Sequence, residues 1–421
     1  MILDRSIRPE YKFINSIQIS DLISTKLRNN IPLFYNIDES NQLIKLVILN
    51  TFGYEKANNF AIPYMTSKLL LEGTQKHNNK ELFDIIEFNG ASLDISTYAD
   101  NSVLSLTVLK SNFANILPLI NELFTCPSFP SDRLAHIKTL ENEEILIDES
   151  DIKYLSYKEL KKQLFGEKHK YGWTKNRQDI DNIKTSDIES CFDKYWNNDV
   201  QMILCGNVDD QVINLINDNI QFNIISSDKN NESKHINEVV DNKKTYIAKE
   251  DSQQTCICIG KKTISPNHSD FHKLWNVISF LGGYFGSRLM MNIREDKGYT
   301  YGIRASLVSL LDESYIVIKT SAKKGYHELI CDEINKEIYK LQNEYVSDEE
   351  LSSFKQFFTG EMLNMISVPF SIVSQYYNIL SKHLSTSYYM DRFNSIVDLT
   401  KDDILNISRQ YLNDFKTVII G

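Results

Sequence analysis

The sequence contains few cysteines, and their spacing argues against a metal ribbon or a disulfide framework. The six cysteines among its 421 residues stand at positions 126, 191, 205, 256, 258 and 331, and no two form a Cys-x-x-Cys pair. Cys256 and Cys258 would lie on one side of a strand as small hydrophobic residues. Scattered cysteines of this kind are typical of reduced, buried thiols.

Positive charge is also scarce. Lys and Arg total 46 against 56 Asp and Glu, which gives a formal net charge of −10. Binding to a phosphate backbone requires a basic surface, so we expect no nucleic-acid partner. An acidic surface mainly favours solubility, although it could also favour basic peptide partners.

Long apolar runs are absent as well. No stretch approaches the roughly 18 apolar residues of a membrane span, so we expect no membrane segment. The first residues, Met-Ile-Leu-Asp-Arg-Ser, lack the apolar core of a secretory signal. A cytoplasmic location is the default prediction.

The common catalytic and phosphate-binding motifs are missing too. The sequence has no Gly-x-Ser-x-Gly elbow, no Walker A motif and no Gly-x-Gly-x-x-Gly after a strand. Gly282, Gly283 and Gly286 stand between two helical patterns, which favours a tight helix–helix turn. His268 and His272 alone have a metal-like spacing, but no nearby carboxylate completes a site, and we expect them in an exposed first helical turn.

An internal repeat is the clearest positive feature. Residues 185–206 and 401–421 each comprise a polar lead, an amphipathic helix ending in Tyr-Trp-Asn or Tyr-Leu-Asn, and an apolar strand that closes on Gly, about 215 residues apart. Residues 82–97 and 290–306 repeat a helix, a glycine stop and a strand. Two matches in the same order at nearly the same offset indicate duplication.

The sequence therefore predicts an α+β fold of two duplicated domains, each a mostly antiparallel sheet packed with helices. We place the N-terminal domain at 1–225, a polar linker at 226–244 and the C-terminal domain at 245–421. The clearest periodic segments are strands at 44–51, 103–110 and 315–320, and helices at 131–149 and 348–365.

Residues 281–307 stand out within the second domain. A helical apolar stripe runs to Arg294, Gly298 ends it, and a strand follows in which Tyr301 shares a face with Ile303 and Ala305. From the residues alone, Arg294 is a cation that complements the helix dipole. Tyr301 is then an ordinary half-buried strand tyrosine.

This segment resembles the second-domain signature of the insulinase/pitrilysin family of zinc peptidases, the inverzincins. That signature stands here as Ser287-Arg288-Leu289 followed by Arg294-Glu295-Asp296-Lys297-Gly298-Tyr299-Thr300-Tyr301. The resemblance spans nearly the whole chain and includes the first-domain phrases Glu72-Gly73-Thr74 and Asn89-Gly90-Ala91.

The resemblance implies that the zinc motif is degenerate. Active members carry His-x-x-Glu-His a few residues before Gly-Thr, and the matching positions here are Tyr64, Ser67 and Lys68. Glu141 would occupy the downstream ligand position, with Glu143 or Glu144 as alternatives in a shifted register. One carboxylate beside a lysine does not provide the three protein ligands of a hydrolytic zinc site, so we expect no metal in this chain.

The same resemblance implies a function shared with a second subunit. Arg294 and Tyr301 match the family's pair that binds the substrate backbone and stabilises the oxyanion. In the small heterodimeric members, one chain keeps this pair and a His-x-x-Glu-His partner holds the zinc. We therefore expect a peptide substrate and a homologous zinc-bearing partner, with residues 91–98 matching the edge strand that takes up peptide.

Two alternatives remain open. One is a catalytically inert structural or peptide-binding homologue, like the core proteins of respiratory complexes, for which an intact Arg294/Tyr301 pair would be unnecessary. The zinc-less subunit of the mitochondrial processing peptidase is closer to the predicted role, because it also pairs with a zinc-bearing subunit, but its long glycine-rich loop is absent here. The other alternative is a homodimeric peptide-binding protein.

Overall fold

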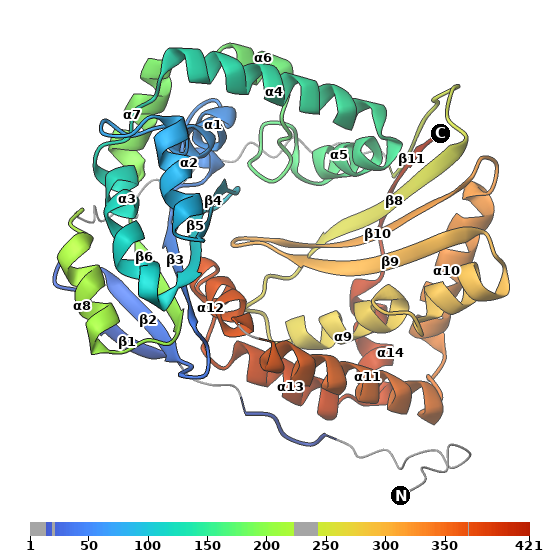
Figure 1. Cartoon of the computed structure of the whole chain (residues 1–421). Helices are drawn as coiled ribbons and strands as arrows, with labels where there is room; N and C mark the ends of the chain where they lie inside the picture. The colour runs from blue at the N-terminus through green and yellow to red at the C-terminus, as the bar shows by residue number, and fades with distance from the viewer. Residues whose placement is uncertain (1–13, 19–21, 223–242, 369) are drawn as a thin grey trace, which may run out of the picture.

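The computed structural model describes residues 14–18, 22–222, 243–368 and 370–421, and it shows two sheet-and-helix halves that face each other (Figure 1). The predicted linker at 226–244 lies almost entirely outside the described residues. Lys244 already begins a strand of the second half. None of the described helices combines the length and the apolar character that a membrane-spanning segment needs.

The first half contains a six-stranded sheet in the order β1-β2-β6-β3-β5-β4. Its strands are β1 (Ile23–Lys26), β2 (Pro32–Ile37), β3 (Leu43–Asn50), β4 (Ser92–Thr97), β5 (Ser102–Leu109) and β6 (Gln201–Gly206). Its helices are α1 (Ala61–Leu70), α2 (Asn79–Phe88), α3 (Phe113–Thr125), α4 (Ser131–Ser150), α5 (Ile152–Phe165), α6 (Arg177–Asp181), α7 (Thr185–Tyr195) and α8 (Asp210–Asn219), with 3₁₀ turns at Tyr54–Lys56 and Lys110–Asn112.

The second half contains a five-stranded sheet in the order β7-β11-β8-β10-β9. Its strands are β7 (Lys244–Ile247), β8 (Gln254–Thr263), β9 (Thr300–Ser309), β10 (Ser314–Lys323) and β11 (Lys416–Ile420). Its helices are α9 (Phe271–Gly282), a π-helix at Met290–Asp296, α10 (His327–Asn343), α11 (Asp348–Ser367), α12 (Ser371–Ser381), α13 (Tyr388–Val397) and α14 (Lys401–Tyr411).

Apart from the additional edge strand β1 of the first sheet, the two sheets have the same connectivity, which confirms the predicted duplication. In each sheet the last strand of the half, β6 or β11, is parallel to one neighbour and antiparallel to the other. All other strand pairs are antiparallel. Gly90 and Gly298 both adopt left-handed backbone angles, with φ of 57° and 64°, where a residue with a side chain would be strained.

The two halves exchange a helix. α5 belongs to the first half in sequence, but it packs on β8 and β11 of the second sheet, where Leu160 joins a cluster with Cys258, Val317 and Val418. α12 belongs to the second half and packs on β3 and β6 of the first sheet. Each sheet therefore has one face covered by its own helices and the other face contacted by a helix from the other half.

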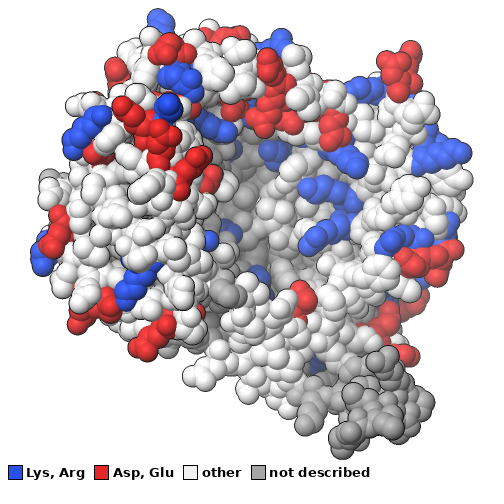
Figure 2. All heavy atoms as spheres, in the orientation of Figure 1, with Lys and Arg blue, Asp and Glu red and all other residues white. Residues whose placement is uncertain are grey.

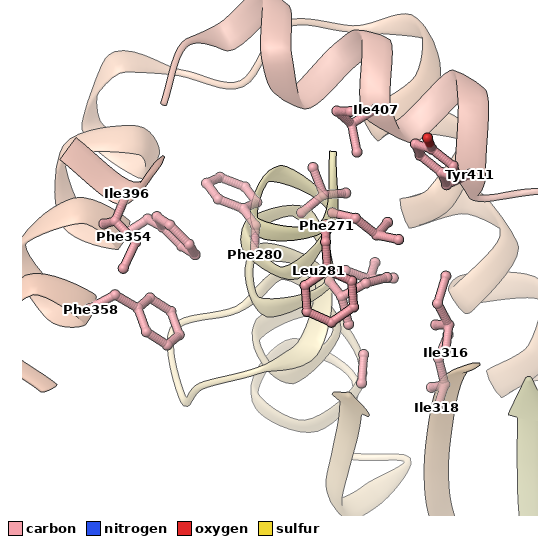
Figure 3. Close-up of a cluster of buried hydrophobic side chains, with 14 of the residues drawn as sticks. Phe271, Phe280, Leu281, Ile316, Ile318, Phe354, Phe358, Ile396, Ile407 and Tyr411 are labelled. Atoms are coloured by element: carbon pink, nitrogen blue, oxygen red, sulfur yellow. The ribbon is translucent and has the colours of Figure 1, made fainter. Parts of the chain in front are cut away.

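The largest core of the described residues lies mainly in the second half, between its sheet and the helices α9–α14. Figure 3 shows α9 in its centre, and Phe280 of this helix lies near Phe354 and Phe358 of α11. Ile316 and Ile318 of β10 line the other side. Alternate β10 residues thus face α9 while their neighbours face α5, so both faces of this sheet are buried.

We predict that Leu160→Ala lowers the free energy of unfolding by about 3 kcal/mol, because it leaves a cavity between α5 and the second sheet. Urea unfolding followed by circular dichroism and tryptophan fluorescence measures this. Leu140→Ala on the adjacent α4 is the matched control, since Leu140 is 49% exposed, and it should change the free energy by less than about 0.5 kcal/mol. Equal losses in the two variants would contradict the helix exchange as a stabilising element.

Candidate functional site

Helix α1 and helix α4 bring three of the predicted zinc-motif positions together. The Tyr64 hydroxyl donates to Glu141 Oε2 at 2.8 Å, and Lys68 Nζ lies 3.5 Å from Glu141 Oε1. Ser67 points elsewhere, because its buried hydroxyl donates to the Tyr64 carbonyl oxygen at 2.8 Å. Glu141, and not Glu143 or Glu144, is therefore the carboxylate that faces α1.

A residue that the sequence analysis did not select completes this cluster. Lys175, in the loop between α5 and α6, places its Nζ 2.7 Å from Glu141 Oε2 and 2.5 Å from Glu144 Oε2. The same ammonium lies 3.3 Å from the Tyr64 hydroxyl. No sequence motif includes Lys175, and only the folded chain brings it to α1 and α4.

Electrostatics holds this cluster in its ionised form. Burial alone would raise the pKa of Glu141, but hydrogen bonds from Lys175 and Tyr64, together with the charges of Lys175 and Lys68, lower it below the ordinary value. Burial likewise opposes the charge of Lys175, and its carboxylate partners raise its pKa nevertheless. The pKa of Tyr64 is raised by burial first and by Glu141 next, so the phenol stays a hydrogen-bond donor.

These residues do not fit a zinc ion. Within the described residues no group of three His, Cys, Asp or Glu side chains could hold a metal. Glu141 supplies a single carboxylate, and Lys175 and Lys68 already neutralise it. Because a hydrolytic zinc site takes about three protein ligands, a fixed ammonium at this position is incompatible with a dication. We name this group of residues the ammonium cluster: Tyr64, Lys68, Glu141, Glu144 and Lys175.

His268 and His272 lie on either side of the start of α9, and the prediction that both stand in an exposed first turn was partly wrong. His268 precedes α9, and its Nδ1 accepts the Asp270 amide N–H at 3.1 Å. His272 is half-buried and not exposed, with its ring 4.7 Å from that of Tyr388. Burial and then the charge of Arg392 lower the pKa of His272 to about 4, so its imidazole is neutral.

Arg294 lies in a π-helical turn and not in the regular helix that the apolar stripe predicts. Its guanidinium stacks on Phe285, with the central carbon 5.0 Å from the ring centroid, and its Nε lies 3.5 Å from Glu295 Oε1. The wide turn ends when the Lys297 and Gly298 amides donate to carbonyls inside it. π-Helical turns are rare and are frequent at functional sites.

A β-bulge corrects the predicted orientation of Tyr301. Thr300 pairs with Ala322 and Ile303 with Thr320, so two residues, Tyr301 and Gly302, oppose a single residue of β10. The expected alternation is broken here, because the bulge rotates Tyr301 out of the face that Ile303 buries. Tyr301 is 94% exposed.

Two threonine hydroxyls hold this bulge. The Thr300 hydroxyl accepts the Gly302 amide N–H at 3.1 Å and lies 2.7 Å from the Ser321 carbonyl oxygen. The Thr320 hydroxyl lies 2.9 Å from both the Gly302 carbonyl oxygen and the Thr300 hydroxyl. A buried polar clamp therefore fixes the backbone that presents Tyr301, and the sequence pattern alone did not reveal it.

Strand β9, which carries Tyr301, and strand β4 are the inner-edge strands of the two sheets. Each is the outermost described strand at one edge of its sheet. An edge strand offers unpaired backbone groups to which an extended peptide can add. No contact in the described part of the chain joins Arg294 or Tyr301 to the ammonium cluster, so the predicted functional residues form two separate groups.

Comparison with known proteins identifies the family. A family model described as "Insulinase (Peptidase family M16)" matches residues 45–170, and one described as "Peptidase M16 inactive domain" matches residues 182–357. A Helicobacter pylori protein named "Non-peptidase homolog YmxG" is 24% identical over 374 residues, which are 86% of this chain and 85% of that protein.

Solved structures share the fold. A structure described as a protease from Helicobacter pylori superposes with a TM-score of 0.84 at 18% identity, covering 95% of this chain and 99% of that one. The periplasmic protease PqqL from Escherichia coli gives a TM-score of 0.79 at 14% identity, covering 98% of this chain but 47% of that longer one. The names of these relatives thus include both proteases and a non-peptidase. Because these two family models together match more than half of the chain, the chain belongs to the insulinase family, peptidase family M16.

Proposed function

We propose that the chain is the non-zinc subunit of a heterodimeric metallopeptidase and supplies Arg294 and Tyr301 to a zinc site on its partner. The observation that carries this proposal is the presentation of Tyr301. A tyrosine that serves only packing would be buried, whereas this one is 94% exposed at an edge strand. The buried threonine clamp stabilises a bulge whose one visible effect is to turn that phenol outward.

The chemistry of the two side chains suits oxyanion stabilisation. A guanidinium and a phenol both donate hydrogen bonds, and negative charge develops on the carbonyl oxygen of a peptide under attack. Zinc on the partner would polarise the same carbonyl and activate the water. Stacking on Phe285 restricts the Arg294 guanidinium without occupying its donors. Arg294 therefore keeps hydrogen-bond capacity for a substrate.

Two further observations support an incomplete site in this chain. The ammonium cluster fills the motif positions with an internal salt bridge, so a nucleophile would have to come from elsewhere. PqqL is about twice as long, and this chain matches 47% of it. A second chain of similar size would therefore give an assembly as large as that protease.

A second candidate function is a catalytically inert, peptide-binding homologue that forms a homodimer. The ammonium cluster and the relative named a non-peptidase homolog favour it. Both candidates include peptide uptake, and they differ in whether Tyr301 and Arg294 affect a rate. The location of the protein stays a prediction, with the cytoplasm as its default.

We predict that a mixture of this chain with a His-x-x-Glu-His homologue cleaves peptides that neither protein cleaves alone. Tyr301→Phe and Arg294→Ala should each lower kcat/KM of the mixture at least tenfold, since one oxyanion donor typically contributes 10²–10³ in rate. Fluorogenic peptide cleavage measures this.

Matched controls on the same protein are Tyr339→Phe, an exposed tyrosine on α10, and Arg28→Ala, an exposed arginine of the first half. Both controls should retain full activity in the mixture. Full activity of the Tyr301→Phe and Arg294→Ala mixtures would reject the catalytic role and favour the inert homologue.

We predict that the purified chain binds no stoichiometric zinc and that Lys175→Met lowers its free energy of unfolding at pH 7 by about 2 kcal/mol. The substitution leaves the buried carboxylate of Glu141 with weaker partners, while Lys68 and Tyr64 limit the loss. Metal analysis and urea unfolding provide the measurements.

The pH dependence follows from the lowered pKa of Glu141. A carboxyl group whose folded-state pKa lies below its unfolded value adds stability above the unfolded pKa and loses it as the pH falls through the folded pKa. The difference between wild type and Lys175→Met should therefore shrink below about pH 4. Stoichiometric zinc in the wild-type chain, or a difference that grows in acid, would contradict the ammonium cluster.

A further inference from the structure

A cavity of about 340 Å³ lies where the exchanged helices meet the tips of two hairpins. α5 and α12 form two of its walls, and the β4–β5 and β9–β10 turns reach it from the two sheets. Its lining is rich in tyrosine and lysine: Tyr54, Tyr98, Tyr157, Tyr171, Tyr315, Tyr377, Lys161, Lys170 and Lys382. Both halves of the chain therefore build this cavity.

The molecule is hollowed between its two halves, and basic side chains gather on one wall of the hollow, over α5 and the strands β8–β10 (Figure 2). Arg304 of β9 and Lys319 of β10 are exposed and directly opposite each other in the strand register. Lys319 Nζ lies 3.7 Å from the centroid of the Tyr157 ring, and Lys161 Nζ lies 5.5 Å from the same centroid. This juxtaposition of like charges is unfavourable unless an anion compensates it.

Two cavity lysines have no carboxylate within salt-bridge distance in the described residues. Lys161 of α5 contacts the Tyr157 ring, and Lys382 at the end of α12 donates to the amide oxygen of Asn378 at 3.2 Å. Lys170 differs, because Glu55, Asp100 and Asp312 surround its ammonium at 2.8–3.1 Å.

The acidic side of the cavity is already engaged. Asp100 is the one acidic residue of its described lining, and its Oδ1 accepts from Lys170 at 2.8 Å and from the Tyr171 hydroxyl at 2.9 Å. The Ser309 hydroxyl, also in the lining, is buried without a hydrogen-bond partner among the described residues. The cavity thus offers two ammonium groups without a carboxylate partner among the described residues and a hydroxyl without a hydrogen bond there.

The titration of these lysines agrees with the geometry. Burial, followed by the charges of Lys319 and Lys158, lowers the pKa of Lys161 to about 8. Burial and then Arg392 also lower the pKa of Lys382, while Asp100 opposes that shift. A bound anion would remove this penalty for both groups.

We propose that this cavity binds a carboxylate of the peptide that the chain takes up, with Lys161 and Lys382 as its cationic partners and the tyrosine rings as its apolar walls. The proposal rests on the proposed peptide-binding function and names its substrate class as acidic peptides. It reverses the expectation from the net charge of −10, because the wall of the hollow over α5 and β8–β10 is basic. An acidic side chain and a free C-terminus both provide a carboxylate.

The test measures fluorescence polarisation of the full chain with labelled decapeptides of alternating Val and Ser. One pair carries a central Glu or Gln in an amidated peptide, and a second pair has Gln with a free or an amidated C-terminus. We expect the carboxylate member of at least one pair to bind about tenfold more tightly at low salt, with the preference weakening as salt rises. The pair that shows the preference identifies the source of the carboxylate.

Variants then connect the preference to the cavity. Lys161→Gln and Lys382→Gln should each reduce the preference at least threefold, chiefly by weakening the binding of the carboxylate member of the pair. Lys26→Gln, an exposed lysine of β1, is the charge-matched control and should keep the full preference. Neither cavity variant should lower the free energy of unfolding, because neither lysine has an acidic partner to lose.

The outcomes separate the two proposals. Equal binding of all four peptides, or a preference that both cavity variants retain, overturns the carboxylate site and leaves peptide uptake intact. Absence of binding by every peptide overturns peptide uptake itself, and the carboxylate site with it. A preference lost in Lys26→Gln as well would show a general charge effect and also overturn the site.

Discussion

The exchange of α5 and α12 is the packing constraint on which the rest of this structure depends. α5 buries one face of the second sheet, and α12 contacts one face of the first. Neither half in sequence can therefore complete its own core. The same exchange sets the two inner-edge strands, β4 and β9, on the hollow between the halves and brings Lys161 and Lys382 into one cavity. Stability and the shape of the proposed binding surface thus arise from one arrangement.

The two groups of candidate functional residues, the ammonium cluster and the pair Arg294 and Tyr301, differ in how their hydrogen-bonding groups are satisfied. The ammonium cluster is closed, since Lys175 and Tyr64 satisfy Glu141 from inside the chain. Arg294 and Tyr301 are open, since a π-helical turn and a β-bulge present them to solvent. Among the described residues Tyr301 has no side-chain partner, and Arg294 is held only by the Phe285 ring and by Glu295 Oε1 at 3.5 Å, so both side chains are available to an external partner. This contrast is the physical basis of the proposal that the chain contributes residues to a catalytic site whose zinc is held by a partner.

The sequence predicted what depends on local periodicity and missed what depends on contacts distant in sequence. The helix at 131–149 and the strands at 44–51 and 103–110 agree with α4, β3 and β5 within a few residues, because the strands carry dense apolar runs and the helix is a long stretch without glycine or proline. The duplication was visible for the same reason. The exchange of α5 was hidden, because its amphipathic face does not reveal which sheet it covers.

At the site, the positions of Tyr64, Lys68 and Glu141 could be chosen from the resemblance, but the residue that neutralises them could not. Lys175 reaches Glu141 from a loop with no motif, so only tertiary structure identifies it. Tyr301 was assigned to the wrong face, because a bulge shifts the two-residue period there, and Gly302 inside the strand is its only sequence signal.

Photo-crosslinking from position 301 tests the central claim most directly. With benzoylphenylalanine in place of Tyr301, this chain would be mixed with a His-x-x-Glu-His homologue and a bound peptide, and the products would be mapped by mass spectrometry. The account predicts cross-links to the peptide or to the zinc-motif helix of that homologue. Cross-links confined to other surfaces of the homologue, or to a second copy of this chain, would contradict it.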